Sequence, residues 1–583
     1  MKHTSGTPRR TGTLLRIGAS VATVALVASA CTGGNTGDDS SSQGPATSGT
    51  NVNPQPQGDP KQGGSLTVAL EAESNGWLPG TGSPAAPGYN VMYAIYDPLV
   101  MTDADGEVKP YLAESFESNV DFTQWTFKLR DGVKFHDGSA LTADVIKQNV
   151  AITKAPSSNL AGSLAEVSSV DAVDALTVRY NLSTPNSAFP ALLQTAPGMP
   201  FSMENYDKLG AAGASASPVG TGPFQFQSWN RGDRLTAVRN DGYWGAPMGM
   251  GPFLDQIVFR PIPDEDTRLQ SLLSGDVDAF QTLRGSIVKQ ALSAAEDGTV
   301  AVHSFVGNNG GTVIFNTLLP PLDDIRVRKA LVQATDQEQI NKVLGNDGIS
   351  PAATQFFTPD NPYFSQKVAD AYPKFDADAA KALLDEYTKD PTRSDGKAVG
   401  SPVAVPFGCP PDPSLTELSQ AYQAFWSNAG FQVSLSSDDQ ATHIGQAIGS
   451  PTQDPPFKGD FSSKCWRTGS EGDPYNILKN EFGPVAKQPL NFTNYTSSVL
   501  TEQLGALATT NDLQERKDAV EKIGLDLAEN VPLAWAASTA AAFGVKPAVQ
   551  NPSTWKLPDG STGVGLGLFQ GGTTVWGQVW QGQ

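Results

Sequence analysis

Residues 110–144 carry an ordered series of strand, turn and helix signals that few folds can accommodate. Apolar and polar residues alternate over 125–130, which predicts a half-buried β-strand with one apolar face. A turn, a second short strand over 133–135 and another turn follow. Thr142 is then expected to cap a helix. The stretch therefore predicts a compact α/β unit and contains no reactive motif.

The same signals continue through the chain. A Gly/Pro-rich loop over 75–89 follows the first predicted strand, and a flexible join is expected at 306–311. Beyond this join, helices and strands alternate, which predicts an α/β lobe with a largely parallel sheet. Strands are predicted over 65–70, 176–180, 257–260, 277–280, 313–315, 431–435 and 531–535, with a hairpin over 220–239. Helices are predicted over 90–96, 188–194, 266–273, 323–333, 376–387, 414–428 and 512–530.

Several short motifs, in a fixed order, resemble one protein family. They lie at 63–68, 96–100, 110–144, 220–224, 239–245, 275–279 and 321–330. Together they resemble the family 5 extracellular solute-binding proteins, the receptors of peptide, nickel and related ABC importers. The resemblance covers residues 62 to about 550.

The resemblance implies an α/β, two-lobed, periplasmic-binding-protein-like fold of type II, in the large family 5 variety. Lobe I would be residues 62–310 plus 533–583, with an inserted subdomain at about 100–215, and lobe II would be 311–532. Two crossing segments would form a hinge, and the ligand would bind in a cleft between the lobes.

The first 30 residues have the pattern of an export signal. Cations precede an apolar run over 17–27 that is too short to span a membrane, and small residues lead to Cys31. This order resembles a bacterial lipoprotein signal, which implies cleavage before Cys31 and lipidation there; Ala28 stands where such signals usually carry Leu. The Arg pair at 9–10 suggests twin-arginine export, but Gly12 replaces a bulky apolar residue, so the ordinary secretory route is favoured.

Residues 31–62 are predicted to form a disordered tether. Only Ala46 and Val52 are apolar beyond Cys31, so the segment cannot bury enough surface to offset its ordering entropy. A lipid on Cys31 would then hold the folded body at the outer face of the cytoplasmic membrane, in the periplasmic or extracellular space.

The chain is acidic. Its formal charge is −20, and removal of the predicted signal leaves −24, which argues against nucleic acid and anionic lipid surfaces as partners. With Cys31 lipidated, Cys409 and Cys465 remain, and an exported protein favours a disulfide between them over two free thiols. The loop of some 57 residues would contribute about 4 kcal/mol in the chain-entropy model.

Motifs of known enzymes are missing from the sequence. There is no G-x-S-x-G elbow, phosphate loop, H-E-x-x-H or dinucleotide fingerprint, and the four histidines are scattered. His136 is a candidate ligand or base, but its place beside an Asp-Gly turn favours a structural role. No enzyme activity, metal site or cofactor is therefore expected.

The segment 465–475 concentrates groups suited to binding. It carries an indole, a guanidinium and two carboxylates, and it resembles the family's Trp…Asp-Pro segment. In peptide receptors of this family an aspartate in this segment grips the ligand's amine; here that position is Ser470. Either Glu471 supplies the charge or the ligand has no amino terminus. The predicted ligand contacts are Tyr89, Asn90, Asn308, Phe407, Trp466, Arg467, Glu471, Asp473 and Tyr475.

Two functions are consistent with these observations. The favoured one is a monomeric substrate-binding lipoprotein that delivers an oligopeptide-like or other polar solute to an ABC permease and its ATPase. The alternative is a family 5 fold that regulates cell-envelope assembly through protein or glycolipid contacts, without transport. A pocket filled by bulky side chains would favour the alternative function, and a deep, wet cavity between the lobes would favour the receptor. Separately, the alternative to ligand contact for the candidate residues is that the aromatic side chains pack the lobe core and Asp473 shapes a turn.

Overall fold

A computed structural model describes residues 52–80, 86–155, 157–158, 160–411, 413–450, 452–468, 472–484, 491–564 and 573–582. These residues belong to one compact unit, residues 47–583. The predicted export signal, Cys31 and the tether up to residue 51 lie outside the described residues. Residues 52–62 of the predicted tether are described, and the prediction of disorder is wrong at Val52 and Gln57: Val52 forms an antiparallel bridge with Ser304, and the Gln57 amide donates to Gln550 Oε1 at 2.7 Å.

A ten-stranded mixed sheet extends through the molecule in the order β14-β13-β15-β12-β16-β11-β1-β10-β9-β8. The predicted hairpin over 220–239 is confirmed as β8 and β9. The predicted sheet of lobe II is only partly parallel: β13 pairs in parallel with β14 and β15, whereas β15, β12 and β16 pair antiparallel. The strands are β1 (Ser65–Leu70), β8 (Phe224–Asn230), β9 (Arg234–Arg239), β10 (Gln256–Pro261), β11 (Ala279–Thr282), β12 (Ala301–Phe315), β13 (Ala404–Gly408), β14 (Gln432–Ser436), β15 (Ser463–Arg467) and β16 (Leu533–Val545).

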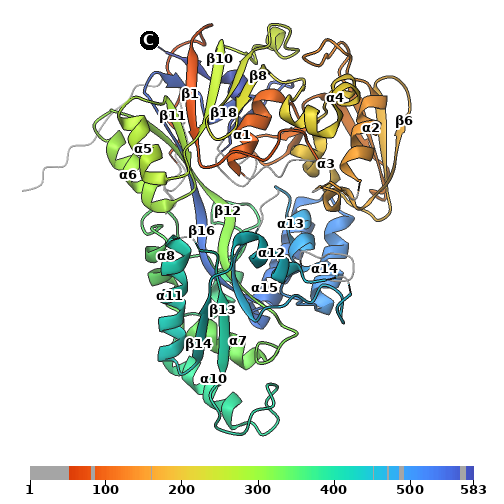
Figure 1. Cartoon of the computed structure of the whole chain (residues 1–583). Coiled ribbons are helices and arrows are strands. Elements are labelled where there is room, and N and C mark those ends of the chain that lie inside the picture. Colours follow the sequence, from red (N-terminus) through yellow and green to blue (C-terminus); the bar gives the residue numbers. More distant parts are fainter. Residues whose placement is uncertain are drawn as a thin grey trace, which may run out of the picture. The chain divides into compact units, whose positions relative to one another are not determined.

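Two long strands, β12 and β16, run side by side along the centre of Figure 1. Ala301–Val306 pairs with one half of β16, and Gly310–Ile314 pairs with the other half. The prediction of a flexible join at 306–311 is wrong, because these residues form a bulge inside one continuous strand. Val306, Gly310 and Gly311 pair with β16, so the sheet satisfies part of the backbone that a join would expose to water.

The chain folds around separate hydrophobic cores that define two lobes. One large and one small core gather side chains from 313–536, and three others gather side chains from 66–302 and 540–579. We call these parts lobe II and lobe I, respectively. Ala188 of the lobe I chain packs in the lobe II core, and Ile349 of the lobe II chain packs in a lobe I core. The exact lobe boundaries given above remain a prediction.

A separate four-stranded sheet, in the order β4-β5-β7-β6, forms a subdomain within lobe I. The alternating apolar residues of β5 point into its core, as their spacing predicted. The second strand predicted at 133–135 is wrong: only one isolated bridge, Lys134 to Ala140, forms there. The subdomain strands are β4 (Ala113–Ser118), β5 (Gln124–Leu129), β6 (Val167–Ala172) and β7 (Thr177–Leu182).

Aspartate and threonine side chains begin several helices at the predicted places. Thr142, Asp376 and Asp512 each accept a hydrogen bond from a first-turn amide, which satisfies a donor that has no partner inside the helix. The helices are α1 (Ala86–Ile95), α2 (Ala143–Thr153), α3 (Phe189–Leu192), α4 (Met203–Ala216), α5 (Glu265–Leu273), α6 (Gly285–Ala295), α7 (Ile325–Gln333), α8 (Gln337–Val343), α9 (Gln366–Ala371), α10 (Ala377–Lys389), α11 (Pro413–Asn428), α12 (Gln440–Ile448), α13 (Pro474–Phe482), α14 (Ser498–Ala508) and α15 (Leu513–Asn530).

Candidate functional site

Strand β15 places the predicted binding segment against the crossing strand β12. Trp466 pairs with Thr312 and Arg467 with Gly311. The Thr468 hydroxyl then hydrogen-bonds the backbone of Gly310, at 3.3 Å to the amide nitrogen and 3.2 Å to the carbonyl oxygen. The segment therefore begins where the chain passes from one lobe to the other.

Trp466 is half-buried in an aromatic and polar cluster. Its ring stacks on His443 with a centroid separation of 5.9 Å and meets Phe492 edge-on at 4.5 Å. Beneath it, the buried Lys464 ammonium donates to Gln446 Oε1 at 2.7 Å and lies 3.2 Å from His443 Nδ1. The other ring nitrogen, His443 Nε2, lies 3.0 Å from the Cys465 carbonyl, which can only accept a hydrogen bond. The proton of the neutral ring is therefore on Nε2, and Nδ1 accepts from Lys464. Burial lowers the pKa of both His443 and Lys464.

Arg467 is exposed to solvent on the opposite face of β15, because side chains alternate along a strand. Its guanidinium makes no hydrogen bond or ion pair within the part of the chain that the structure describes. An exposed guanidinium beside the lobe crossing, with five N–H donors, suits contact with an anionic or carbonyl group.

Asp473 begins helix α13, and its side chain, 20% exposed, pairs with a buried cation. Its carboxylate accepts the Tyr475 amide at 2.8 Å and two bonds from the Arg516 guanidinium, at 2.5 and 2.7 Å. Burial raises the pKa of the Asp473 carboxyl, and the charge and hydrogen bonds of Arg516 and the Tyr475 amide oppose that shift. The carboxylate is therefore occupied within the protein, in agreement with the alternative that Asp473 shapes local structure.

Sequence reasoning missed Arg516. It lies on the buried side of α15, where an amphipathic pattern expects an apolar residue. Besides Asp473, its guanidinium donates to the Leu507 carbonyl, the Thr510 carbonyl and the Ser187 hydroxyl. A cation on the core-facing side of a helix is the signal that would have pointed to a buried acidic partner.

The other predicted contacts are dispersed. Tyr89 and Asn90 are buried on α1 in lobe I. Phe407 is buried in the lobe II core, edge-on to Tyr422 at 5.6 Å, and Tyr475 is buried on α13. Asn308 has its backbone in β12, while its side chain lies outside the described residues, as do Ser470 and Glu471. Trp466 and Arg467 thus lie on β15, Asp473 and Tyr475 lie at the start of α13, and Phe407 lies on the neighbouring strand β13.

The two lobe II cysteines form a disulfide. Cys409 follows β13 and Cys465 lies in β15, with their Cα atoms 5.2 Å apart. The bond lies one residue from Trp466 and ties the parallel pair β13–β15 together beside the segment.

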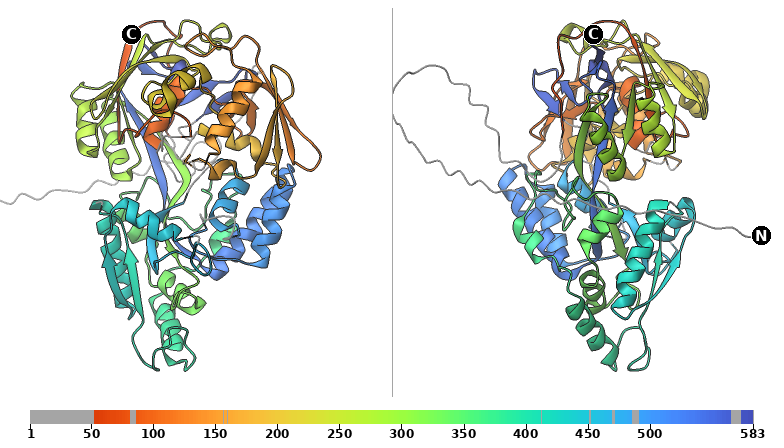
Figure 2. Two further views of the ribbon diagram at one scale, coloured as in Figure 1. Left: turned by 45° about the vertical axis from the view of Figure 1, so that its right-hand side comes forward. Right: turned by 90° about the vertical axis from the view of Figure 1, so that its left-hand side faces the viewer.

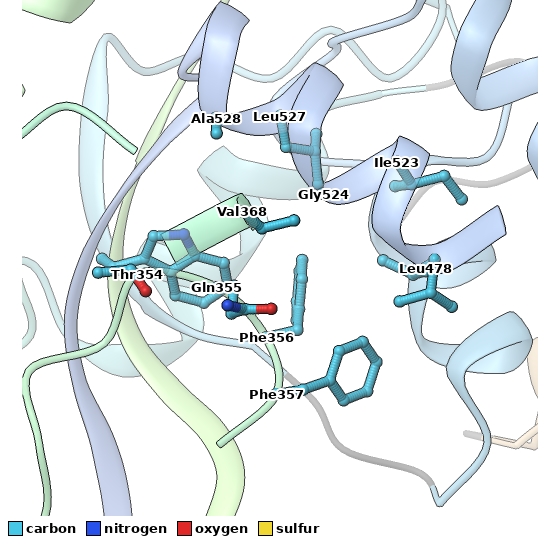
Figure 3. A pocket seen from close by; sticks show the side chains of 12 residues that line it. Thr354, Gln355, Phe356, Phe357, Val368, Leu478, Ile523, Gly524, Leu527 and Ala528 are labelled. Atoms are coloured by element: carbon cyan, nitrogen blue, oxygen red, sulfur yellow. The ribbon is translucent and has the colours of Figure 1, made fainter. Parts of the chain in front are cut away.

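A small pocket of about 20 Å³ lies in lobe II (Figure 3). Phe356, Leu478 and Ile523 are among its apolar lining residues, and Thr354 and Gln355 supply its polar atoms. The Gln355 side-chain amide is already hydrogen-bonded to the backbone of Ser365. The pocket therefore suits an apolar group and offers little to orient a polar solute.

The described residues contain no group of three or more His, Cys, Asp or Glu side chains placed to hold a metal ion. Among the helices of the described part, none is long and apolar enough to cross a membrane.

Known proteins resemble this chain along most of its length. The sequence profile of the bacterial extracellular solute-binding proteins, family 5, matches residues 107–488. The dipeptide-binding protein of Escherichia coli K12 is 26% identical over 453 residues, which cover 73% of this chain and 80% of that protein. The nickel-binding periplasmic protein of the same organism is 25% identical over 454 residues, covering 73% and 81%.

A solved structure shows the same fold. The periplasmic binding protein DppA from Helicobacter pylori, in complex with the peptide STSA, matches with a TM-score of 0.72 at 20% identity, covering 90% of this chain and 99% of that one. The fold is thus that of the two-lobed periplasmic binding proteins. The chain belongs to the bacterial extracellular solute-binding proteins of family 5.

Proposed function

We propose that this protein is the substrate-binding subunit of an ABC importer, which captures an oligopeptide-like or other polar solute between its lobes and passes it to a membrane permease. The observation that carries the proposal is the pair of strands β12 and β16, which joins two separately packed cores. Two adjacent crossing strands let the lobes move about one axis while each core stays intact. Relatives named for dipeptide and nickel binding support the class of protein.

The solute would lie beside the crossing, with Trp466 and Arg467 as its main contacts. Of the predicted residues, these two keep exposed or half-exposed side chains, whereas Phe407 and Tyr475 are buried and Asp473 is paired with Arg516. A half-buried indole can stack on a planar or apolar part of the solute, and the guanidinium can receive a carboxylate or carbonyl oxygen. Tyr89, Asn90, Asn308 and Glu471 remain proposed contacts.

The proposal includes export and a membrane anchor. Cys31 would be lipidated after signal cleavage, and the tether would keep the lobes near the permease at the outer face of the cytoplasmic membrane. ATP hydrolysis would belong to other subunits, and this chain would need no cofactor.

Native mass spectrometry of the protein purified from its own cell envelope tests the proposal. A retained small molecule, bound one per chain and lost or weakened in Trp466→Ala and Arg467→Ala, is the expected result. A series of retained peptide masses would identify a peptide receptor, and one discrete other mass would identify the solute. A protein that retains nothing, and that peptide, sugar and opine libraries do not stabilise against heat, would contradict the proposal.

A further inference from the structure

A second set of contacts joins the lobes away from the crossing strands. It lies between the subdomain of lobe I and helices α13, α14 and α15 of lobe II. The subdomain and this group of helices are neighbours in both views of Figure 2. We call this set the interlobe clasp. Its members are Glu166, Ser187 and Ala188 on lobe I and Asn476, Lys479, Leu507, Ala508 and Arg516 on lobe II.

The outer part of the clasp is an ion pair. Lys479 Nζ lies 2.5 Å from Glu166 Oε1, and the two side chains are 25% and 18% exposed. Thr184 and Asn186 also donate to the Glu166 carboxylate, so lobe I holds it in place before lobe II approaches. A preorganised and partly shielded pair loses less side-chain entropy on pairing than an exposed one, and salt still screens it.

The inner part of the clasp consists of buried hydrogen bonds. The Ser187 amide donates to the Ala508 carbonyl at 2.9 Å, and its hydroxyl donates to the Leu507 carbonyl at 2.8 Å. These carbonyls end α14 and have no partner inside the helix. Asn476 on α13 donates to the Ala188 carbonyl at 3.2 Å, and the Ala188 side chain packs in the lobe II core. Lobe I thus caps one helix of lobe II and packs against another.

Arg516 connects the clasp to the segment proposed to contact the solute. Its guanidinium donates to the Ser187 hydroxyl at 3.0 Å, while two further bonds hold Asp473 at the start of α13. The same helix carries Asn476 and Lys479, which reach lobe I directly. A displacement of Asp473 at the start of α13 therefore changes the geometry of the clasp through one buried cation.

We propose that the interlobe clasp is a closure device with its own stabilising contacts, and that Arg516 is the positioning residue that links it to the solute segment. The clasp holds the lobes together by protein contacts alone, so the closed form is populated in the absence of solute. Solute binding then shifts an open-to-closed equilibrium in which the closed form is already populated. Less binding energy is therefore needed to complete closure. This inference rests on the proposed function.

Small-angle X-ray scattering of the solute-free, full-length protein tests the ion pair. Glu166→Lys or Lys479→Glu alone should increase the radius of gyration, with roughly a two- to five-fold shift of the open-to-closed ratio, as expected for a partly exposed ion pair. The double variant Glu166→Lys/Lys479→Glu should recover part of the wild-type value, because the swapped pair attracts but Thr184 and Asn186 no longer hold a carboxylate at position 166. The matched control is Lys367→Glu, because its 2.7 Å pair with Glu521 lies within lobe II. Unchanged scattering in the single variants, or no recovery in the double variant, would overturn the proposal.

Arg516 is tested by the same scattering measurement together with thermal unfolding. Ser187→Ala removes only the lobe I hydroxyl and should open the lobes with little change in melting temperature. Arg516→Lys keeps the charge beside Asp473 but lacks the planar fork, so it should also open them. The Ser187→Ala change should open the Arg516→Lys protein less than it opens the wild type. Additive effects would overturn the role of Arg516. If the variants open as expected but native mass spectrometry finds no solute, the clasp is supported and the proposed transport function is contradicted.

Discussion

Asp97 is a buried carboxylate whose charge opposes folding. It accepts hydrogen bonds from Trp244 at 2.8 Å, Thr221 at 3.1 Å and Tyr243 at 3.2 Å. Burial raises the pKa of Asp97 to about 6, although these three donors act in the opposite direction. Because the folded protein binds this proton more tightly than the unfolded chain, the contribution of Asp97 to stability is complete below about pH 4 and is lost as pH rises through about 6.

The Asp97→Asn variant isolates this effect, since it cannot titrate. Relative to the variant, the wild type should gain about 3 kcal/mol of unfolding free energy when the pH falls from 7.5 to 4, the amount that a shift of about two pKa units carries. Urea unfolding of both proteins over this pH range measures the difference. A difference that stays constant with pH would show that Asp97 is ionised in the folded protein.

Arg516 and Asp473 form a largely buried pair, with side chains 6% and 20% exposed, so removing one partner should be costly. Arg516→Met leaves the Asp473 carboxylate without its cation, and the free energy of unfolding should fall by about 3 kcal/mol, the lower end for a buried pair. Lys367→Met removes a cation that is 75% exposed and should change stability little. Equal midpoints for the two variants in urea unfolding would contradict the role assigned to the buried pair.

Residues with local roles were predictable, and those with distant partners were not. Thr142, Asp376 and Asp512 cap helices because the bond closes within three residues, and the sequence shows both ends of it. Asp473 also caps a helix, but its partner Arg516 is 43 residues away. Nothing local in the sequence distinguishes Arg516 from a surface arginine, apart from its position on the core-facing side of α15.

At the level of elements, the crossing strands show why a segment rich in glycine and asparagine can be predicted as a flexible loop and still form a strand. The run from 306 to 311 has the composition of a flexible join, yet β16 on one side and β15 on the other pair with its ends. Tertiary hydrogen bonds therefore override a weak local preference. The hairpin of β8 and β9 could be predicted from local residues alone, because its two strands and turn are contiguous in the sequence.

The disulfide should stabilise lobe II by constraining the unfolded chain. Replacing Cys409 and Cys465 together by Ser should lower the free energy of unfolding by up to about 4 kcal/mol, as loop-closure entropy predicts. Thermal unfolding of the wild type with and without a thiol reductant measures the effect. The double variant serves as the control, because the reductant should leave its unfolding unchanged. A wild type that reductant does not affect would contradict this contribution.

At the level of the whole molecule, family membership and the two-lobed fold were predictable because motifs spread over most of the chain occur in order. The interlobe clasp was not predictable. Its contacts join positions 288 to 329 residues apart in the Asn476–Ala188 and Arg516–Ser187 pairs. Serine, asparagine and lysine at such positions look like ordinary surface residues until the fold brings them together.

Hydrogen–deuterium exchange of the full-length protein, with and without the solute identified by mass spectrometry, tests the central claim that one solute is enclosed by both lobes. Protection should increase in 463–468 of lobe II and in 86–96 of lobe I at the same solute concentration, because closure shields both sides together. Residues 377–389 on α10 should not respond, since they lie on lobe II away from the crossing. Protection confined to one lobe, or none at saturating solute, would contradict the account.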